Sequence, residues 1–245
     1  MFPRSSFGPR RHPGFFASTV RRDACAFTVT ELLVILGLVA VLCVVLFPGI
    51  KRAREQAQAA ECAVKLRWIG NELLTYATEH QGWVKVSAAN RWYTYLPGVV
   101  STLKAPGVAW ATADFRKIGC LTGKPPTISH TYGLLLNTQT HDGLSRMEEV
   151  NIGGSIFREW SDRILLRPQP GSYPFLADTA ISDGNQGSYF YTRKDGEGWS
   201  RLCARHSGKV NVWFADGHLE ACDEARLRAL NVLYVRDNEG REKKF

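Results

Sequence analysis

The sequence predicts an α+β fold in which a long N-terminal helix packs on a C-terminal, antiparallel β-rich head. Three observations lead to this prediction. Residues 32–50 contain no charge, residues 51–80 have the composition and periodicity of an amphipathic helix, and residues 81–245 alternate short apolar runs with turn signals. We therefore divide the chain into a basic leader (1–26), a transmembrane helix (27–50), a stalk helix (51–80) and a globular head (81–245).

The apolar run is long enough to cross a membrane. Leu32–Phe47 holds sixteen consecutive apolar or glycine residues, and a bilayer core of about 30 Å needs roughly 20 residues of helix. A buried core helix does not fit a run that is apolar on all sides and charged at both ends. A cleaved secretory signal has a shorter apolar region, of roughly 7–15 residues, and ends in small residues. We therefore expect a single-pass membrane protein.

The formal charge of +8 is unevenly distributed. Residues 1–26 hold five arginines and one aspartate, which accounts for half of it. No dense basic patch with interleaved aromatic residues occurs in the sequence, so nucleic-acid binding is not expected. Because basic residues favour the cytoplasmic side of a membrane span, we expect the leader in the cytoplasm and the head outside the inner membrane.

The segment before the apolar run, residues 21–31, reads RRDACAFTVTE. It resembles the prepilin (class III) signal, in which a basic leader ends in a small residue ahead of an aromatic residue and a glutamate. The resemblance implies cleavage between Ala26 and Phe27 by a prepilin peptidase that also methylates the new amine. It places Glu31 fifth in the mature chain and Pro48, a kinking proline, twenty-second. The family usually has glycine where this chain has Ala26.

Glu31 is the expected assembly residue. A carboxylate at the edge of a membrane helix is costly unless it faces a partner. In a filament, the partner implied by the resemblance is the N-terminal amine of Phe27 in a neighbouring subunit. The alternative is that Glu31 lies among lipid headgroups without a function.

Residues 51–80 predict a helix that continues beyond the membrane, because helix-forming residues fill the segment and Gly82 follows as a helix-ending residue. An apolar face at helical spacing comprises Cys62, Leu66, Ile69, Leu73 and Tyr76. Together with A-R-E-x-A at Ala53–Ala57, this pattern is similar to a subgroup of prepilin-like proteins.

The head contains several candidate strands: Tyr132–Leu136, Arg163–Leu166, Tyr173–Ala177 and Ser188–Thr192. The clearest pattern is a hairpin within residues 206–221, in which Asp216-Gly217 separates two extended runs and predicts a type I′ turn. His206, nine intervening residues and then Asp216 and Gly217 resemble the H-X9-DG signature of a family of prepilin-like proteins.

Two sets of residues are candidates for metal binding. His206, Asp216 and His218 offer ligand atoms for a transition metal, but the turn alone explains Asp216. An oxygen-rich loop that is a weak candidate for Ca²⁺ contains Asp178, Asp183, Gly184 and Asn185. We interpret this loop as a polar surface segment and expect no cofactor. The sequence has no G-x-S-x-G elbow, P-loop or G-x-G-x-x-G fingerprint, so we expect no enzymatic activity.

Four of the six cysteines follow the apolar run: Cys62, Cys120, Cys203 and Cys222. They allow three full pairings, among which the sequence does not choose. No C-x-x-C pair occurs, which argues against a zinc ribbon or a thioredoxin-like site. Because Cys203 and Cys222 flank the hairpin, we hypothesise a disulfide between them.

These observations favour a structural subunit of pilin or pseudopilin type, assembled into an envelope filament at the cell surface or into a type II secretion pseudopilus. The expected partners are a prepilin peptidase/methyltransferase, other pilin-like subunits and an inner-membrane assembly platform. The alternative is a membrane-tethered extracytoplasmic binding module that uses the prepilin signal without polymerising. An exported metal-dependent enzyme is the weakest of the three hypotheses.

Overall fold

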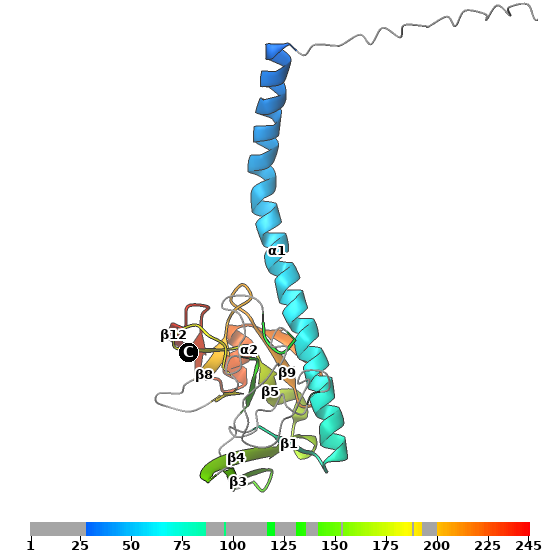
Figure 1. Cartoon of the computed structure of the whole chain (residues 1–245), viewed down its shortest axis with the longest axis vertical. Coiled ribbons are helices and arrows are strands. Elements are labelled where there is room, and N and C mark those ends of the chain that lie inside the picture. The colour runs from blue at the N-terminus through cyan, green and yellow to red at the C-terminus, as the bar shows by residue number, and fades with distance from the viewer. Residues whose placement is uncertain are drawn as a thin grey trace, which may run out of the picture. The chain divides into compact units, whose positions relative to one another are not determined.

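The computed structural model describes residues 28–86, 96, 117–120, 131–135, 142–152, 154–187, 189–192 and 200–245. The chain divides into two compact units, Met1–Pro48 and Gly49–Phe245. Helix α1 (Val29–Glu79) runs from the first unit into the second, and the boundary falls at Pro48 inside it. The predicted α+β class, with one long N-terminal helix and an antiparallel-rich β region, is confirmed (Figure 1).

At the start and at the end of α1, hydrogen bonds pair backbone groups that have no partner within the helix. At the start, Thr28 and Glu31 form a capping box: the Glu31 N–H donates to Thr28 Oγ1 (3.3 Å), and the Thr28 N–H donates to Glu31 Oε2 (2.8 Å). At the end, Gln81 adopts a left-handed conformation (φ +56°), and the Gly82 N–H donates to the Ala77 carbonyl (2.7 Å). This bond is that of a Schellman motif, so the helix ends three residues before Gly82.

Three sheets make up the described β structure of the second unit. The first has the order β1-β4-β3, with bounds Trp83–Lys85, Ser155–Arg163 and Ser145–Ile152. The second has the order β10-β9-β5-β2-β7, with bounds Leu219–Cys222, Val210–Phe214, Pro174–Ala177, Gly133–Leu135 and Tyr189–Phe190. The third has the order β12-β11-β8-β6, with bounds Glu242–Lys244, Tyr234–Arg236, Ser200–Cys203 and Thr179–Ile181.

Most described strand pairs are antiparallel, and the β11–β8 and β2–β7 pairs are parallel. Short helices complete the unit: α2 (Glu224–Ala229) and the 3₁₀ turns η2 (Ile164–Leu166) and η3 (Pro170–Ser172). Asp223 caps α2, because its side chain accepts the Arg226 N–H (2.9 Å).

The five-stranded sheet has an apolar cluster on each of its faces. On one face, the buried side of α1 packs against residues such as Phe175 and Trp213, and β5 and β9 lie beside the helix (Figure 1). On the other face, Val212 and Phe214 pack with residues from β8, α2 and β11. Because β9 is covered on both faces, all five of its residues are buried.

Four of the five residues predicted for the apolar face of the stalk are buried: Cys62, Leu66, Ile69 and Leu73. The fifth, Tyr76, is half-buried and stacks on His80 (ring centroids 3.8 Å apart), while Ala77 occupies the buried position next to it.

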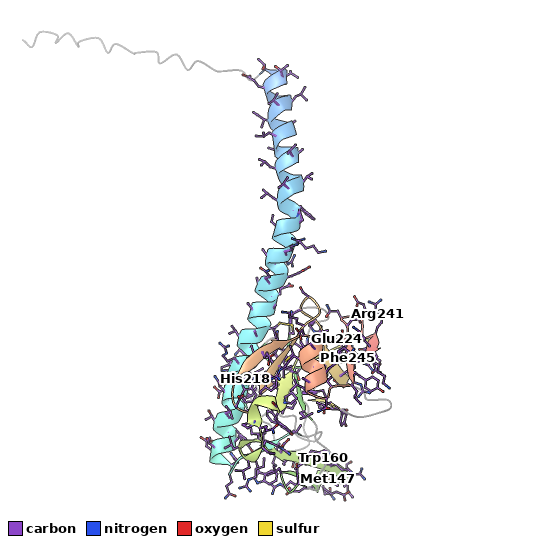
Figure 2. All side chains as sticks on the ribbon, turned by 180° about the vertical axis from the view of Figure 1, so that it is seen from behind. Met147, Trp160, His218, Glu224, Arg241 and Phe245 are labelled. Atoms are coloured by element: carbon purple, nitrogen blue, oxygen red, sulfur yellow. A yellow bond between two sulfur atoms is a disulfide. The ribbon has the colours of Figure 1, made fainter. Side chains whose placement is uncertain are left out.

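The strand predictions are only partly correct. Three candidate strands contain β2, β5 and β7, but Arg163–Leu166 is wrong: β4 ends at Arg163 and the next three residues form η2. The β3–β4 ribbon was not predicted, because charged residues occupy both of its faces and hide the alternation that marks a strand. Met147 and Trp160, which are opposite each other in this ribbon, are labelled in Figure 2.

Candidate functional site

The first half of α1 is the region in which the chain leaves its apolar side chains uncovered. Every residue of 29–50 is exposed, and Glu31 is the only charged residue among them. Among the described residues, α1 is the one helix long and apolar enough to span a membrane. The predicted cleavage residues Ala26 and Phe27 lie outside the described residues.

Glu31 occupies the third position of α1, inside its first turn. Its Oε2 atom accepts two hydrogen bonds from Thr28, from the backbone N–H and from the hydroxyl group (both 2.8 Å). In the single chain, the carboxylate therefore accepts a backbone N–H that would otherwise have no hydrogen-bond partner at the start of the helix. The sequence contains the capping pattern T-x-x-E at Thr28–Glu31. We did not predict this cap, because the only partner that we considered for Glu31 was in another subunit.

The second half of α1 holds the head through a close approach between a glycine and a tryptophan. A Cβ atom at Gly70 would overlap the indole ring of Trp213. Trp213 is fully buried, and its ring also packs against Phe175 with centroids 6.1 Å apart. The absence of a side chain at Gly70 thus lets the β9 strand approach the helix.

The signature residues His206, Asp216 and Gly217 lie at two different turns on either side of β9. His206 pairs with Lys209 through two backbone hydrogen bonds (3.2 and 3.0 Å), and the intervening Ser207 and Gly208 have φ values of +52° and +80°. Positive φ at both central residues defines a type I′ turn. The type I′ turn is therefore the one that precedes β9.

The predicted type I′ turn at Asp216-Gly217 is wrong. The Phe214 N–H donates to the His218 carbonyl and the Gly217 N–H donates to the Phe214 carbonyl (both 2.9 Å), which leaves a three-residue loop. Gly217 has φ +93°, whereas Asp216 is not among the described residues with positive φ. The loop is a type I turn followed by a glycine bulge, and it requires positive φ at the glycine alone.

Asp216 and His218 pair within this turn. Asp216 Oδ1 accepts the backbone N–H of His218 (3.1 Å) and lies 2.6 Å from its Nδ1. Burial opposes ionisation of Asp216, but the hydrogen bonds from His218 outweigh it, so the pKa of this carboxyl lies below its ordinary value. The His218 ring, labelled in Figure 2, stacks on Phe214 with centroids 4.3 Å apart.

The predicted set His206, Asp216 and His218 does not gather around one point. The one group of three or more His, Cys, Asp or Glu side chains that converges among the described residues is Cys62, Cys120 and His206. The candidate calcium loop does not gather its oxygen atoms either. Asp178 is buried and faces His206, whereas Asp183 is exposed and accepts hydrogen bonds from Asn185.

The hypothesis of a Cys203–Cys222 disulfide is wrong, because the structure joins Cys62 to Cys120 and leaves the other two free. Cys203 and Cys222 end strands of different sheets, and their Sγ atoms donate to the carbonyls of Asp237 (3.4 Å) and Glu220 (3.9 Å). Burial raises the pKa of each free thiol to about 12. Both thiols therefore stay protonated at neutral pH and are poor nucleophiles.

The disulfide belongs to a buried cluster that links α1 to the head. Cys62 is on α1, and Cys120 is held by Gln186, which accepts its N–H (2.9 Å) and donates to its carbonyl (2.6 Å). His206 Nε2 lies 3.4 Å from Cys120 Sγ and 3.3 Å from Asp178 Oδ2. The Asp178 Oδ1 atom has no hydrogen-bond partner among the described residues. We call these four residues, Cys62, Cys120, Asp178 and His206, the cysteine–histidine cluster.

A second group of buried polar side chains lies around Arg167. The Arg167 guanidinium donates to Asp162 (2.8 and 2.7 Å), to Asp142 and to Ser145. Burial raises the pKa of Asp162 even though Arg167 opposes the shift. These bonds tie the end of β4 to the start of β3, so we assign the group a structural role.

The chain matches no protein-family model, no curated protein and no solved structure. Its layout of a long N-terminal apolar helix followed by a β-rich head is compatible with that of pilins. The functional assignment therefore depends on the site itself.

Proposed function

We propose that this protein is a structural subunit of pilin or pseudopilin type, cleaved before Phe27 and assembled from the inner membrane into a filament or secretion pseudopilus. The observation that carries the proposal is the first half of α1, where residues 29–50 are exposed on every side and Glu31 is the only charge. An apolar surface that the chain does not cover needs lipid or other copies of the same helix around it.

Glu31 supports assembly rather than simple anchoring. A plain membrane anchor gains only the Thr28 cap from a carboxylate inside the first turn of its helix, and acids are unfavourable in the bilayer. In a bundle of such helices, the carboxylate can exchange its Thr28 hydrogen bonds for an ion pair with the amine of a neighbouring chain. An ion pair in a low-dielectric bundle is stronger than in water and fixes the stagger between subunits.

The second unit supports a head outside the cytoplasm. A disulfide between Cys62 and Cys120 is typical of proteins in oxidising compartments. It closes a loop with a sequence separation of 58 and contributes about 2–4 kcal/mol to stability. The disulfide thus fixes the head to the stalk helix. A filament subunit requires this connection, because its head and its helix move together during assembly. This role involves no enzymatic activity.

Assembly is tested with two substitutions that separate the charge of Glu31 from its capping role. Glu31→Gln removes the charge but keeps an oxygen acceptor for Thr28, because glutamine also serves in capping boxes. Thr28→Val removes the capping hydroxyl but keeps the carboxylate, at a cost of about 0.5–2 kcal/mol to the helix start. Each variant is co-produced with a prepilin peptidase and an assembly platform, and filaments are sheared and quantified.

We expect Glu31→Gln to lose filaments while it remains in the membrane fraction, and Thr28→Val to keep them. Mass spectrometry of the mature N-terminus reports in parallel whether cleavage before Phe27 and methylation have occurred. If Glu31→Gln leaves every readout unchanged, the membrane-tethered binding module is the better assignment. If the wild-type chain retains its initiator methionine, the proposal fails altogether.

A further inference from the structure

We infer that the cysteine–histidine cluster is a second functional site: when its disulfide is reduced, Cys62, Cys120 and His206 bind one Zn²⁺ or a similar ion of borderline softness, and the neighbouring Asp178 carboxylate favours the cation. This inference goes beyond the proposed function and does not depend on it. It arises from the convergence of three side chains from distant parts of the sequence, whose ligand atoms lie within 4.8 Å of one another.

The distance between His206 and Cys120 is the one that a tetrahedral ion requires. With Zn–S near 2.3 Å and Zn–N near 2.0–2.1 Å, a nitrogen ligand lies about 3.5 Å from a sulfur ligand. In the structure, the Nε2 atom of His206 lies 3.4 Å from Cys120 Sγ. The same nitrogen lies 3.3 Å from Asp178 Oδ2, so a cation bound to it would have a carboxylate beside it.

The ligand set is chemically suited to zinc. Two thiolates and one imidazole supply three of the four ligands of a tetrahedral site, and the −2 charge of the thiolates balances a divalent cation. Asp178 is buried, and its Oδ1 atom has no hydrogen-bond partner among the described residues. A buried carboxylate with an unused acceptor is unfavourable, and a cation bound beside it at His206 Nε2 would offset that cost.

Rigid elements hold each ligand and the neighbouring carboxylate. Cys62 lies inside α1, the Gln186 side chain fixes the backbone of Cys120, and a type I′ turn fixes His206. Asp178 lies between β5 and β6, where its carbonyl accepts the Cys203 N–H (2.9 Å). A site held on rigid elements loses little entropy when the ion binds.

The disulfide and the metal state exclude each other. Reduction by an external dithiol transfers two electrons to the Cys62–Cys120 bond, which breaks while the dithiol becomes a disulfide. The two thiols then release two protons as they bind the cation. The sulfur atoms are free to turn about their Cα–Cβ bonds, with Cα atoms 5.3 Å apart in the oxidised form. Either state connects α1 to the head, so the ion replaces the cross-link that reduction removes.

The experiment uses the full-length protein in detergent micelles and Co²⁺ as a spectroscopic probe. Oxidised and phosphine-reduced samples are titrated with Co²⁺ without oxygen, and Zn²⁺ is then added to displace it. We expect one Co²⁺ per chain in the reduced sample alone, with the visible bands of tetrahedral cobalt and a thiolate-to-cobalt charge-transfer band. We expect His206→Gln and Asp178→Asn to weaken binding by at least about tenfold.

Matched controls come from the same chain. A Cys203→Ser/Cys222→Ser double variant removes two buried thiols outside the cluster, and His218→Gln removes an exposed histidine. Both are expected to bind Co²⁺ as the wild type does. The inference is overturned if the reduced, folded wild type binds no stoichiometric cobalt, or if His206→Gln binds it equally well. It is also overturned if the reduced protein unfolds and Co²⁺ does not restore its near-ultraviolet circular dichroism.

Discussion

The two halves of α1 place apolar residues in opposite situations. In residues 29–50, apolar side chains cover every side of the helix and all are exposed. In residues 62–77, one apolar face of the helix is buried, and Leu66, Ile69 and Leu73 have no exposed surface. The second half is satisfied by its own head, whereas the first half needs surroundings that the chain does not supply. The same secondary structure therefore serves as a core element in one half and, in the function that we propose, as an assembly or membrane element in the other.

The largest expected effect comes from charging the first half. Leu38→Arg with Leu42→Arg places two guanidinium groups near the middle of the apolar segment. At about 2.5–3.5 kcal/mol each, they disfavour insertion by about 5–7 kcal/mol in total. We expect the double variant to leave the membrane fraction after alkaline extraction.

The matched control for this double variant has the same spacing in the second half. Ala60 and Val64 are both exposed on the stalk, so Ala60→Arg with Val64→Arg should leave membrane extraction and the folding of the head unchanged. If the control leaves the membrane as readily as Leu38→Arg with Leu42→Arg, the two halves do not differ as we describe.

A smaller effect is expected where the second half contacts the head. Gly70→Ala forces a methyl group against the Trp213 ring, and overpacking of this kind costs about 1–3 kcal/mol. Trp213→Ala should cost more, about 3–5 kcal/mol, because it leaves a cavity in the core. Urea unfolding followed by near-ultraviolet circular dichroism measures both.

Two comparisons separate this contact from a general helix effect. Gly49→Ala meets nothing within 4 Å on the same helix, so it should be neutral or slightly stabilising. In a Trp213→Leu background, the cost of Gly70→Ala should shrink, because the two positions are in contact. Equal costs in both backgrounds would show that the ring and the glycine are not coupled.

Local patterns in the sequence predicted the long helix and several strands. The contacts of the candidate site could not be predicted in this way, because they join residues that lie far apart in the sequence. The buried face of the stalk follows from the spacing of Cys62, Leu66 and Ile69, since helical periodicity is a local property. Nothing local in the sequence indicates that Gly70 leaves space for Trp213, which lies far along the chain. Cys120 was not chosen as the partner of Cys62 for the same reason, since four cysteines allow three pairings.

The smallest effect concerns the turn at Asp216, which lies in the second unit. Because the pKa of Asp216 is lowered from 3.8 in the folded chain, its ionised form stabilises the fold above that pH. The contribution is lost as the pH falls through the folded pKa. Solvent screening limits it to less than about 1 kcal/mol. We expect Asp216→Asn to lower the melting temperature slightly at pH 7 and to flatten its decline as the pH falls below about 4, where the wild-type carboxylate becomes protonated. His218→Phe keeps the stacking on Phe214 but removes the ring nitrogen, so it should flatten the decline less than Asp216→Asn. An unchanged decline in Asp216→Asn would mean that the pairing with His218 does not contribute to stability.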